Sequence, residues 1–305
     1  MAARAINKMN HPTIFQASNG TCIEYLIRDN YSPNVVFWFS AFTQGPRLGK
    51  ILKTTPKFHG FRVSSENSEF NWVLIRDHAG YTNDGTYYGG KAGNLFIEDA
   101  VSELIAKLSS DFTERESNTR FIAMGSSMGG YAAMKFALLC NMGSCFVYSP
   151  HFDMRIAMRN CGRKLWIEWA LADGTEQEKQ EYLCRLQILL EQNASAVRNT
   201  KVLIQATSDD RFVYPEQIVP FLEKYRSAGG SIELDLRDRG GHTSIHTPNE
   251  YIFAVLRELS KGTIPLPESL QGFPQRKYSR SEKIEKVLNN IEHLVMGALK
   301  MLRIR

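Results

Sequence analysis

The clearest chemistry in the sequence lies where an apolar run, a glycine-rich turn and a second apolar run follow one another. Residues 125–129 read Gly-Ser-Ser-Met-Gly, the G-x-S-x-G pattern, with Ser127 at its centre. The run 121–124 predicts a buried strand, and the run 131–139 predicts a helix. A sharp turn between them would project the Ser127 hydroxyl above the sheet edge. It would also place the Met128 N–H at the helix N-terminus, where positive partial charge accumulates. The pattern therefore predicts a nucleophile beside an oxyanion donor.

Other uses of a glycine-rich turn fit this one less well. Such turns between a strand and a helix also bind phosphate, but no Lys-Ser or Lys-Thr follows the glycines, as a P-loop requires. The dinucleotide pattern G-x-G-x-x-G needs a second glycine where Ser127 stands. Ser126 is the alternative nucleophile, but the glycine frame is offset for it.

A serine hydroxyl is a poor nucleophile at neutral pH and needs a histidine base, which in turn needs an acid to fix its tautomer. Asp209 and Asp210 follow the apolar run 202–205, and both qualify as the acid. One of them is expected to cap the next segment instead, because aspartate is common in turns and at helix starts.

The candidate base is His242, which follows two glycines after the alternating strand pattern 232–236. The glycines would let the loop place the imidazole beside Ser127. His246 is the alternative base. The remaining histidines have no comparable placement in the sequence, and these are His11, His59, His78, His151 and His293.

The elements that must position these residues alternate between strands and helices. Strands are predicted at 13–16, 21–27, 35–39, 72–75, 121–124, 145–148, 202–205 and 232–236, and helices at 95–108, 131–139, 216–228 and 251–259. This alternation predicts an α/β fold with a largely parallel central sheet flanked by helices and an antiparallel N-terminal edge. Catalytic groups are then expected at the carboxyl ends of the strands.

Residues 154–198 interrupt the alternation with a helical pattern, which we interpret as a cap over the site; a lengthened crossover is the alternative. The cap divides the core into residues 1–153 and 199–262. A linker rich in proline and glycine then leads to an amphipathic helix over 281–303 within the last segment, 263–305. This helix could pack on the body, form a homodimer contact, or dock on a membrane surface or a partner.

Composition excludes several classes of protein. Of 305 residues, 43% are hydrophobic and 23% are charged, which is typical of globular proteins, and the net charge of +5 is too mild to indicate a nucleic-acid partner. No apolar run approaches the length of a bilayer span, and the N-terminus lacks the apolar core of a signal peptide. The five cysteines form no C-x-x-C pair, which predicts no metal site and a reducing, cytoplasmic setting. No cofactor is implied.

Taken together, three loops resemble the signature loops of the α/β-hydrolase superfamily: Gly-Ser-Ser-Met-Gly-Gly, then Ser-Asp-Asp-Arg-Phe-Val-Tyr-Pro, then Arg-Gly-Gly-His. The resemblance covers roughly residues 30–260. It implies an α/β-hydrolase fold and a triad in the order Ser127, acid, His242. The acid loop is similar to that of prolyl-oligopeptidase-like members, and on that match Asp209 is the triad acid.

The same resemblance implies a second oxyanion donor in the loop after the 35–39 strand. That loop reads Ser-Ala-Phe-Thr instead of the usual His-Gly, so the N–H of Phe42 or of Ala41 would serve. The tyrosine-rich loop after the 72–75 strand is expected at the rim of the site, where Tyr87 and Tyr88 could stack on sugar rings.

The predicted activity is acyl transfer through an acyl-enzyme on Ser127, from a small acyl donor or ester substrate. Water as acceptor makes the protein an ester hydrolase, and a sugar hydroxyl makes it an O-acyltransferase. The rim loop together with the serine turn resembles bacterial proteins of glycan and capsular polysaccharide biosynthesis, which implies a glycan acceptor. The alternative is an inactive binding or scaffold protein of this fold, in a biosynthesis or secretion complex.

Overall fold

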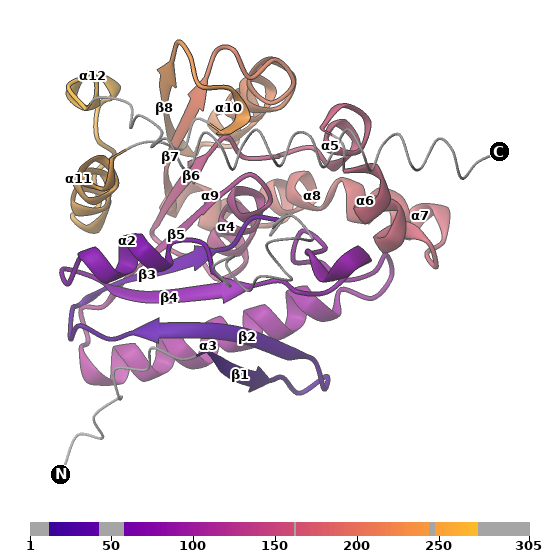
Figure 1. Cartoon of the computed structure of the whole chain (residues 1–305), viewed down its shortest axis with the longest axis horizontal. Coiled ribbons are helices and arrows are strands. Elements are labelled where there is room, and N and C mark those ends of the chain that lie inside the picture. The colour runs from indigo at the N-terminus through magenta and orange to yellow at the C-terminus, as the bar shows by residue number, and fades with distance from the viewer. Residues whose placement is uncertain (1–11, 43–57, 162, 244–247, 274–305) are drawn as a thin grey trace, which may run out of the picture.

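The computed structural model describes residues 12–42, 58–161, 163–243 and 248–273. At its centre is an eight-stranded sheet in the order β1-β2-β4-β3-β5-β6-β7-β8 (Figure 1). Strand β2 is antiparallel to both neighbours, β1 and β4, whereas every other pair is parallel. The strands are β1 (Thr13–Gln16), β2 (Cys22–Arg28), β3 (Asn34–Phe39), β4 (Asn71–Arg76), β5 (Arg120–Ser126), β6 (Ser144–Tyr148), β7 (Lys201–Thr207) and β8 (Ser231–Arg237). The expected α/β class is confirmed.

Helices connect the parallel strands and cover both faces of the sheet. They are α2 (Phe61–Glu66), α3 (Phe96–Arg115), α4 (Met128–Leu139), α5 (Met154–Asn160), α6 (Lys164–Leu171), α7 (Glu176–Leu183), α8 (Arg185–Gln192), α9 (Ala194–Asn199), α10 (Val219–Ser227), α11 (Asn249–Ser260) and α12 (Pro267–Leu270). Short helical turns are η1 (Tyr81–Asn83), η2 (Tyr214–Ile218) and η3 (Gly241–Thr243). Within the described ranges, no helix is long and apolar enough to cross a membrane.

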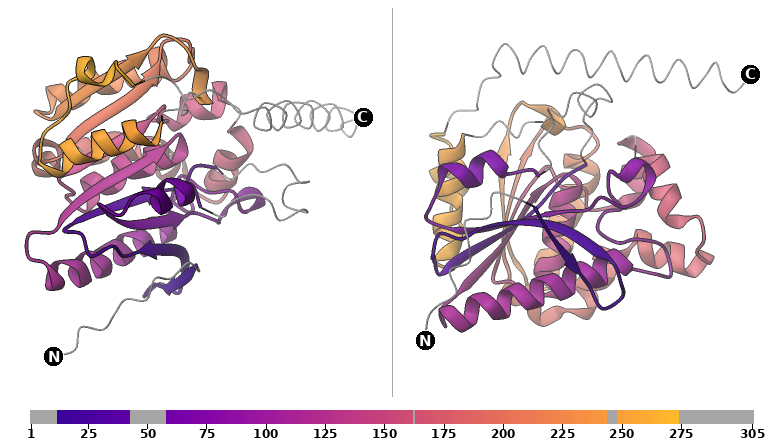
Figure 2. Two further views of the ribbon diagram at one scale, coloured as in Figure 1. Left: turned by 60° about the vertical axis from the view of Figure 1, so that its left-hand side comes forward. Right: turned by 60° about the horizontal axis from the view of Figure 1, so that its bottom comes forward.

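The continuous apolar strands reflect burial on both faces, because a strand covered on one side only would alternate with polar residues. In β3, Val35 and Phe37 pack in a core shared with α3, α4 and α10. Val36 and Trp38 point to a second core on the other face, shared with α11. Figure 2 shows the twisted sheet with helices on both of its sides.

Five helices, α5 to α9, lie between β6 and β7, where the sequence predicts a helical segment. The last two pack against α4 on the sheet, as an ordinary crossover would, while α6 contacts the turn η1. In Figure 1, α5, α6 and α7 lie on the side of the molecule opposite α11 and α12. The segment therefore combines a crossover at its end with an extension at its start.

A buried ionic cluster ties this segment and a loop to the core. Glu98 of α3 pairs with Lys135 of α4 at 2.9 Å and with Arg185 of α8. Burial would raise the pKa of the Glu98 carboxyl, but the two cations hold it below its ordinary value. Lys135 Nζ also donates to the carbonyls of Tyr87 and Tyr88. One carboxylate thus holds together three helices, α3, α4 and α8, and, through the lysine, the loop that follows β4.

Some boundaries differ from those predicted. The short helix α2 was not expected, and α3 continues seven residues beyond the predicted end at 108, to Arg115. The helix predicted at 216–228 begins as the π-helical turn η2, and α10 follows with Pro220 in its first turn, where proline is tolerated. The amphipathic helix predicted over 281–303 and the alternative base His246 lie outside the described residues.

Candidate active site

Ser127 sits in a strained turn between β5 and α4. Its backbone has φ 52° and ψ −120°, a conformation that residues other than glycine rarely adopt. The neighbouring glycines make the turn sterically feasible. A Cβ on Gly129 would lie 2.1 Å from the carbonyl oxygen of Phe39, and one on Gly125 would lie 2.2 Å from that of Gly129. The turn therefore presses closely on the end of β3, as the sequence pattern predicts.

Three side chains form a hydrogen-bonded relay at the carboxyl ends of the strands. Ser127 Oγ lies 2.9 Å from His242 Nε2, and His242 Nδ1 lies 2.9 Å from Asp210 Oδ2. A neutral imidazole that donates from Nδ1 to the carboxylate accepts the serine hydroxyl proton at Nε2. The arrangement has the geometry of a Ser-His-Asp triad. The structure thus brings together Ser127 and His242, 115 residues apart in the chain.

The pairing expected for Asp209 is wrong, because Asp210 is the aspartate that contacts His242. Asp209 instead accepts the N–H groups of Gly240 at 3.0 Å and Gly241 at 2.8 Å. These backbone donors, Gly241 foremost, lower the pKa of the Asp209 carboxyl. Both aspartates lie in the loop that follows β7. The sequence alone therefore could not tell which carboxylate contacts His242 and which binds the loop that carries His242.

Two backbone N–H groups are candidates for binding an oxyanion. Met128 is the first residue of α4, and the first N–H groups of an α-helix have no acceptor within the helix. In the loop after β3, the Ala41 N–H donates to His59 Nδ1 at 3.3 Å, which leaves Phe42 as the candidate donor of that loop. This loop directly follows Phe39, whose carbonyl oxygen is in close contact with Gly129.

His59 supports that loop as a neutral side chain. Burial, reinforced by the positive charge of Arg76, lowers the pKa of His59 to about 4. Its Nδ1 accepts from Ala41, and its own backbone N–H donates to the Ser40 hydroxyl at 3.3 Å. The His59 imidazole and backbone N–H thus hold Ala41 and Ser40, the two residues that precede Phe42.

His151, which the sequence analysis set aside, lies against the base. Its ring stacks on that of His242, with centroids 4.8 Å apart and planes 12° apart. Its Nδ1 lies 2.9 Å from the Tyr87 hydroxyl, and its backbone N–H donates to the carbonyl of Ser127. Burial, and then the proximity of His242, keep the pKa of His151 well below 6.5. The usable signal was its position just after β6, at the edge where the parallel strands end.

Tyr87 and Tyr88 do not form an exposed rim, and that expectation is wrong. Both residues are buried. The Tyr88 hydroxyl donates to the carbonyls of Ser40 and Ile75, while the Tyr87 hydroxyl contacts His151. Asp77 shapes their loop by accepting N–H groups, including that of Tyr88. Their hydroxyls therefore bind groups next to the site, namely His151 and the backbone carbonyls of Ser40 and Ile75.

Aromatic rings from η1 and α6 continue the wall of the site. The ring of Phe42 contacts Tyr87 and Trp166 edge-on, at centroid distances of 5.3 and 5.7 Å. Trp166 in turn contacts Tyr81, and the Arg163 guanidinium lies 4.6 Å from the centroid of Phe42. The helical segment between β6 and β7 therefore reaches the loop that carries the second candidate oxyanion donor.

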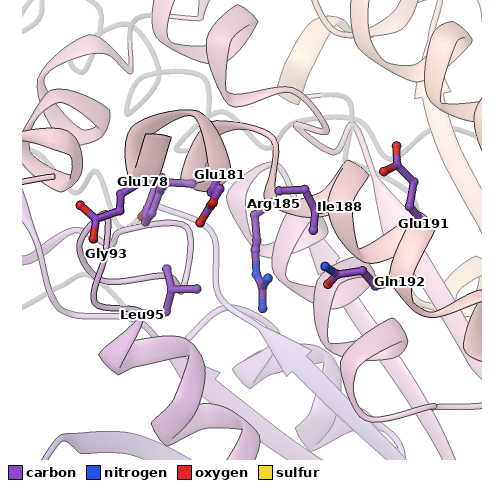
Figure 3. Close-up of a pocket in the computed structure, with 9 residues that line it drawn as sticks. Gly93, Leu95, Glu178, Glu181, Arg185, Ile188, Glu191 and Gln192 are labelled. Carbon is purple, nitrogen blue, oxygen red and sulfur yellow. The ribbon is translucent and has the colours of Figure 1, made fainter. Parts of the chain in front are cut away.

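A separate pocket of about 540 Å³ lies between the loop at Gly93 and helices α7 and α8. Figure 3 shows Arg185 between Glu181 and Gln192. The Arg185 guanidinium donates to the Glu98 carboxylate. No triad residue lines this pocket. In the part of the chain that the structure describes, no three potential metal-ligating side chains come together.

The fold and this site define the protein as an α/β-hydrolase-type protein with a serine-centred relay. The chain belongs to the family described as "Putative esterase", whose family model matches residues 23–247. No curated protein matches the chain in a sequence comparison.

Several solved structures share the fold at low sequence identity. The capsule O-acetyltransferase of Neisseria meningitidis serogroup A has a TM-score of 0.64 at 15% identity, covering 83% of this chain and 97% of that one. The serine hydrolase FphF of Staphylococcus aureus, described as fluorophosphonate-binding, has a TM-score of 0.52 at 14% identity, with the same coverage. The Gap123 glycosylation-associated complex of Streptococcus agalactiae has a TM-score of 0.59 at 16% identity, covering 87% of this chain but 48% of that one.

Proposed function

We propose that the chain is a serine-dependent acyl-transfer enzyme acting as an ester hydrolase or O-acyltransferase. The observation that carries the proposal is the continuous relay from Ser127 through His242 to Asp210, with 2.9 Å at each step. Membership of the esterase family supports the same reaction class. The strained φ of Ser127 also supports it, because such strain is common at functional sites and projects the hydroxyl from the turn.

In the proposed mechanism, Ser127 Oγ attacks the carbonyl carbon of an ester or thioester while His242 Nε2 takes the hydroxyl proton. Asp210 stabilises the imidazolium that forms. The N–H groups of Met128 and Phe42 stabilise the negative charge on the carbonyl oxygen. His242 then gives the proton to the leaving group, and an acyl-enzyme remains. The acceptor, water or an alcohol, repeats the cycle in reverse and releases the acyl group.

For the acceptor, we propose a hydroxyl group of a bacterial glycan or capsular polysaccharide. Two of the proteins that share this fold have names referring to capsule acetylation and to glycosylation, and this likeness supports the proposal. Since Tyr87 and Tyr88 are buried, the rings available to stack on a sugar are those of Trp166 and Tyr81. On this proposal, the start of the 154–198 segment caps the site through its contact with Phe42.

The decisive experiment is labelling with a fluorophosphonate probe, which reacts with activated serines. We expect the folded wild-type chain to be labelled and mass spectrometry to place the adduct on Ser127. Ser127→Ala should lose the label, whereas Ser126→Ala is the matched control and should retain it. A folded wild-type chain that takes no label would overturn the proposal in favour of an inactive scaffold of this fold.

The acceptor is tested with the same enzyme and an acetyl aryl ester. Release of the aryl alcohol measures formation of the acyl-enzyme, and mass spectrometry measures whether added oligosaccharide becomes acetylated. Transfer to sugar in competition with water supports the O-acyltransferase assignment. Release of acetate alone, at every oligosaccharide concentration, assigns the chain as a hydrolase.

A further inference from the structure

Arg163, just before α6, is a cation that forms no ion pair with any residue that the structure describes. Its guanidinium lies 4.6 Å from the ring centroid of Phe42 and 5.7 Å from that of Trp166. Its Nε is buried and has no hydrogen-bond partner, and the same holds for the indole Nε1 of Trp166. Two donors from neighbouring residues of this segment are therefore buried beside the loop after β3, without an acceptor among the described residues.

The neighbouring cations of the same segment are different. Arg155 pairs with Asp153 at 2.6 Å, and Lys164 pairs with Glu168 at 3.6 Å. Among the described residues, no carboxylate forms an ion pair with Arg163. Burying part of a charged group without a partner is costly, so such an arrangement is expected where a ligand completes it. A guanidinium held against aromatic rings is well placed to bind a carboxylate or phosphate, because its planar fork can donate two parallel hydrogen bonds.

The position of Arg163 connects it to the acyl-transfer site through Phe42. The backbone N–H of Phe42 is the proposed second oxyanion donor, and its ring lies against the guanidinium. The same ring contacts Tyr87, whose hydroxyl bonds to His151, and His151 stacks on the base. The guanidinium therefore lies against the side chain of the residue whose backbone N–H is the proposed second oxyanion donor.

We propose that Arg163, assisted by the Trp166 indole N–H, binds an anionic group of the substrate, a carboxylate or a phosphate close to the scissile carbonyl. This inference rests on the proposed function and names its substrate class as esters or thioesters that carry a negative charge. The charge is either on the acyl group or on the alcohol or thiol that leaves, and the two sources are distinguished experimentally.

The test compares kcat/KM for two matched pairs of esters. For charge on the acyl group, the pair is p-nitrophenyl hemisuccinate and p-nitrophenyl methyl succinate. For charge on the leaving group, the pair is p-acetoxybenzoate and its methyl ester. We expect the wild type to prefer the charged member of one pair. The ratio of charged to neutral kcat/KM should fall about tenfold or more in Arg163→Gln, and less in Arg163→Lys, which keeps the charge.

Lys164→Gln is the matched control, because it removes a neighbouring positive charge that already has a carboxylate partner, and its ratio should stay at the wild-type value. A wild type with no preference in either pair, or a preference that survives in Arg163→Gln, would overturn the inference. Failure of the proposed function looks different, since the wild type would then turn over none of the four esters. Thermal unfolding verifies that each variant is folded.

Discussion

The imidazole rings of His151 and His242 stack face to face, 4.8 Å between centroids, so the candidate base packs against a second histidine. Because the pKa of His151 is well below 6.5, through burial first, this second ring stays neutral at neutral pH. It therefore packs on the base without adding a charge beside it. The Tyr87 hydroxyl, 2.9 Å from Nδ1, fixes the orientation of the ring from the other side.

The contact between Tyr87 and His151 is expected to act as a unit. Tyr87→Phe leaves the buried Nδ1 of His151 without a partner, and His151→Phe does the same to the Tyr87 hydroxyl. Each change should lower the free energy of unfolding by about 1–3 kcal/mol. The double variant should lose less than the sum, because no unpaired polar group remains. Urea unfolding of the four proteins measures this, and strictly additive losses would contradict it.

The two aspartates after β7 should affect different properties. Asp210→Asn removes the charge that stabilises the His242 imidazolium, and we expect kcat on a short aryl ester to fall by about three to four orders of magnitude. Asp209→Asn keeps one acceptor oxygen for the N–H groups of Gly240 and Gly241, so its loss of kcat should be much smaller. This ranking is the reverse of the one that the sequence analysis implies.

Steady-state kinetics on the two single variants decides the ranking, with thermal unfolding as the control for folding. Equal kcat in Asp210→Asn and the wild type would remove Asp210 from the mechanism. A larger loss in Asp209→Asn would show that holding the histidine loop matters more than the charge beside the base.

Gly129 is expected to tolerate no side chain. A Cβ there would lie 2.1 Å from the carbonyl oxygen of Phe39, so Gly129→Ala must push the turn away from β3. We expect loss of fluorophosphonate labelling at Ser127 together with a fall in unfolding free energy of roughly 1–3 kcal/mol. Gly143→Ala is the matched control, because nothing lies within 4 Å of its added Cβ. Normal labelling of Gly129→Ala would show that the turn is more adaptable than the geometry implies.

The free energy of unfolding should decrease as the pH is lowered, because His59 has a lower pKa in the folded protein. Its pKa is lowered from 6.5 to about 4 in the folded protein, so between these values the unfolded chain binds the proton more strongly. The contribution is fully present above pH 6.5 and is lost as the pH falls towards 4. Between about pH 7 and about pH 5, we expect the titration of His59 to lower the free energy of unfolding by about 2 kcal/mol.

His59→Gln keeps a side-chain acceptor for the Ala41 N–H but does not titrate, so it is the variant for this test. Urea unfolding at the two pH values should show a smaller loss for the variant than for the wild type. The buried His151 contributes in the same direction and remains in both proteins. An identical loss in both would mean that His59 takes up protons equally in the folded and unfolded states.

The sequence predicts the sheet and the serine turn well because both depend on local patterns. Continuous apolar runs report burial on both faces, as in β3, and the glycine spacing around Ser127 follows from backbone contacts at the turn. The order Ser127, aspartate, His242 could be predicted from three loops after three strands.

The remaining features of the site depend on side-chain and backbone orientations that are set by tertiary contacts and that no local sequence pattern encodes. Asp209 and Asp210 are adjacent, and a change of one residue in register decides which carboxylate meets the base. Tyr87 and Tyr88 sit in a loop whose composition is typical of a surface, yet Asp77 and Lys135 draw their backbone inwards. Arg163 becomes notable only once the rings beneath it and the absence of an ion pair with a described residue are seen together.

If the chain forms the proposed acyl-enzyme, the anchoring of helices α7 and α8 bears on how water is kept from it. Tyr182 donates to the carbonyl of Thr86, and Arg185 pairs with the buried Glu98, so the middle of the segment is tied to the loop after β4 and to α3. If this segment caps the site as proposed, it would be a fixed cover and would not open and close as a lid. Water would then have to be excluded from the acyl-enzyme by the acceptor that occupies the site. We therefore expect a bulky acceptor to displace water by its own volume, and a small one to leave hydrolysis in control.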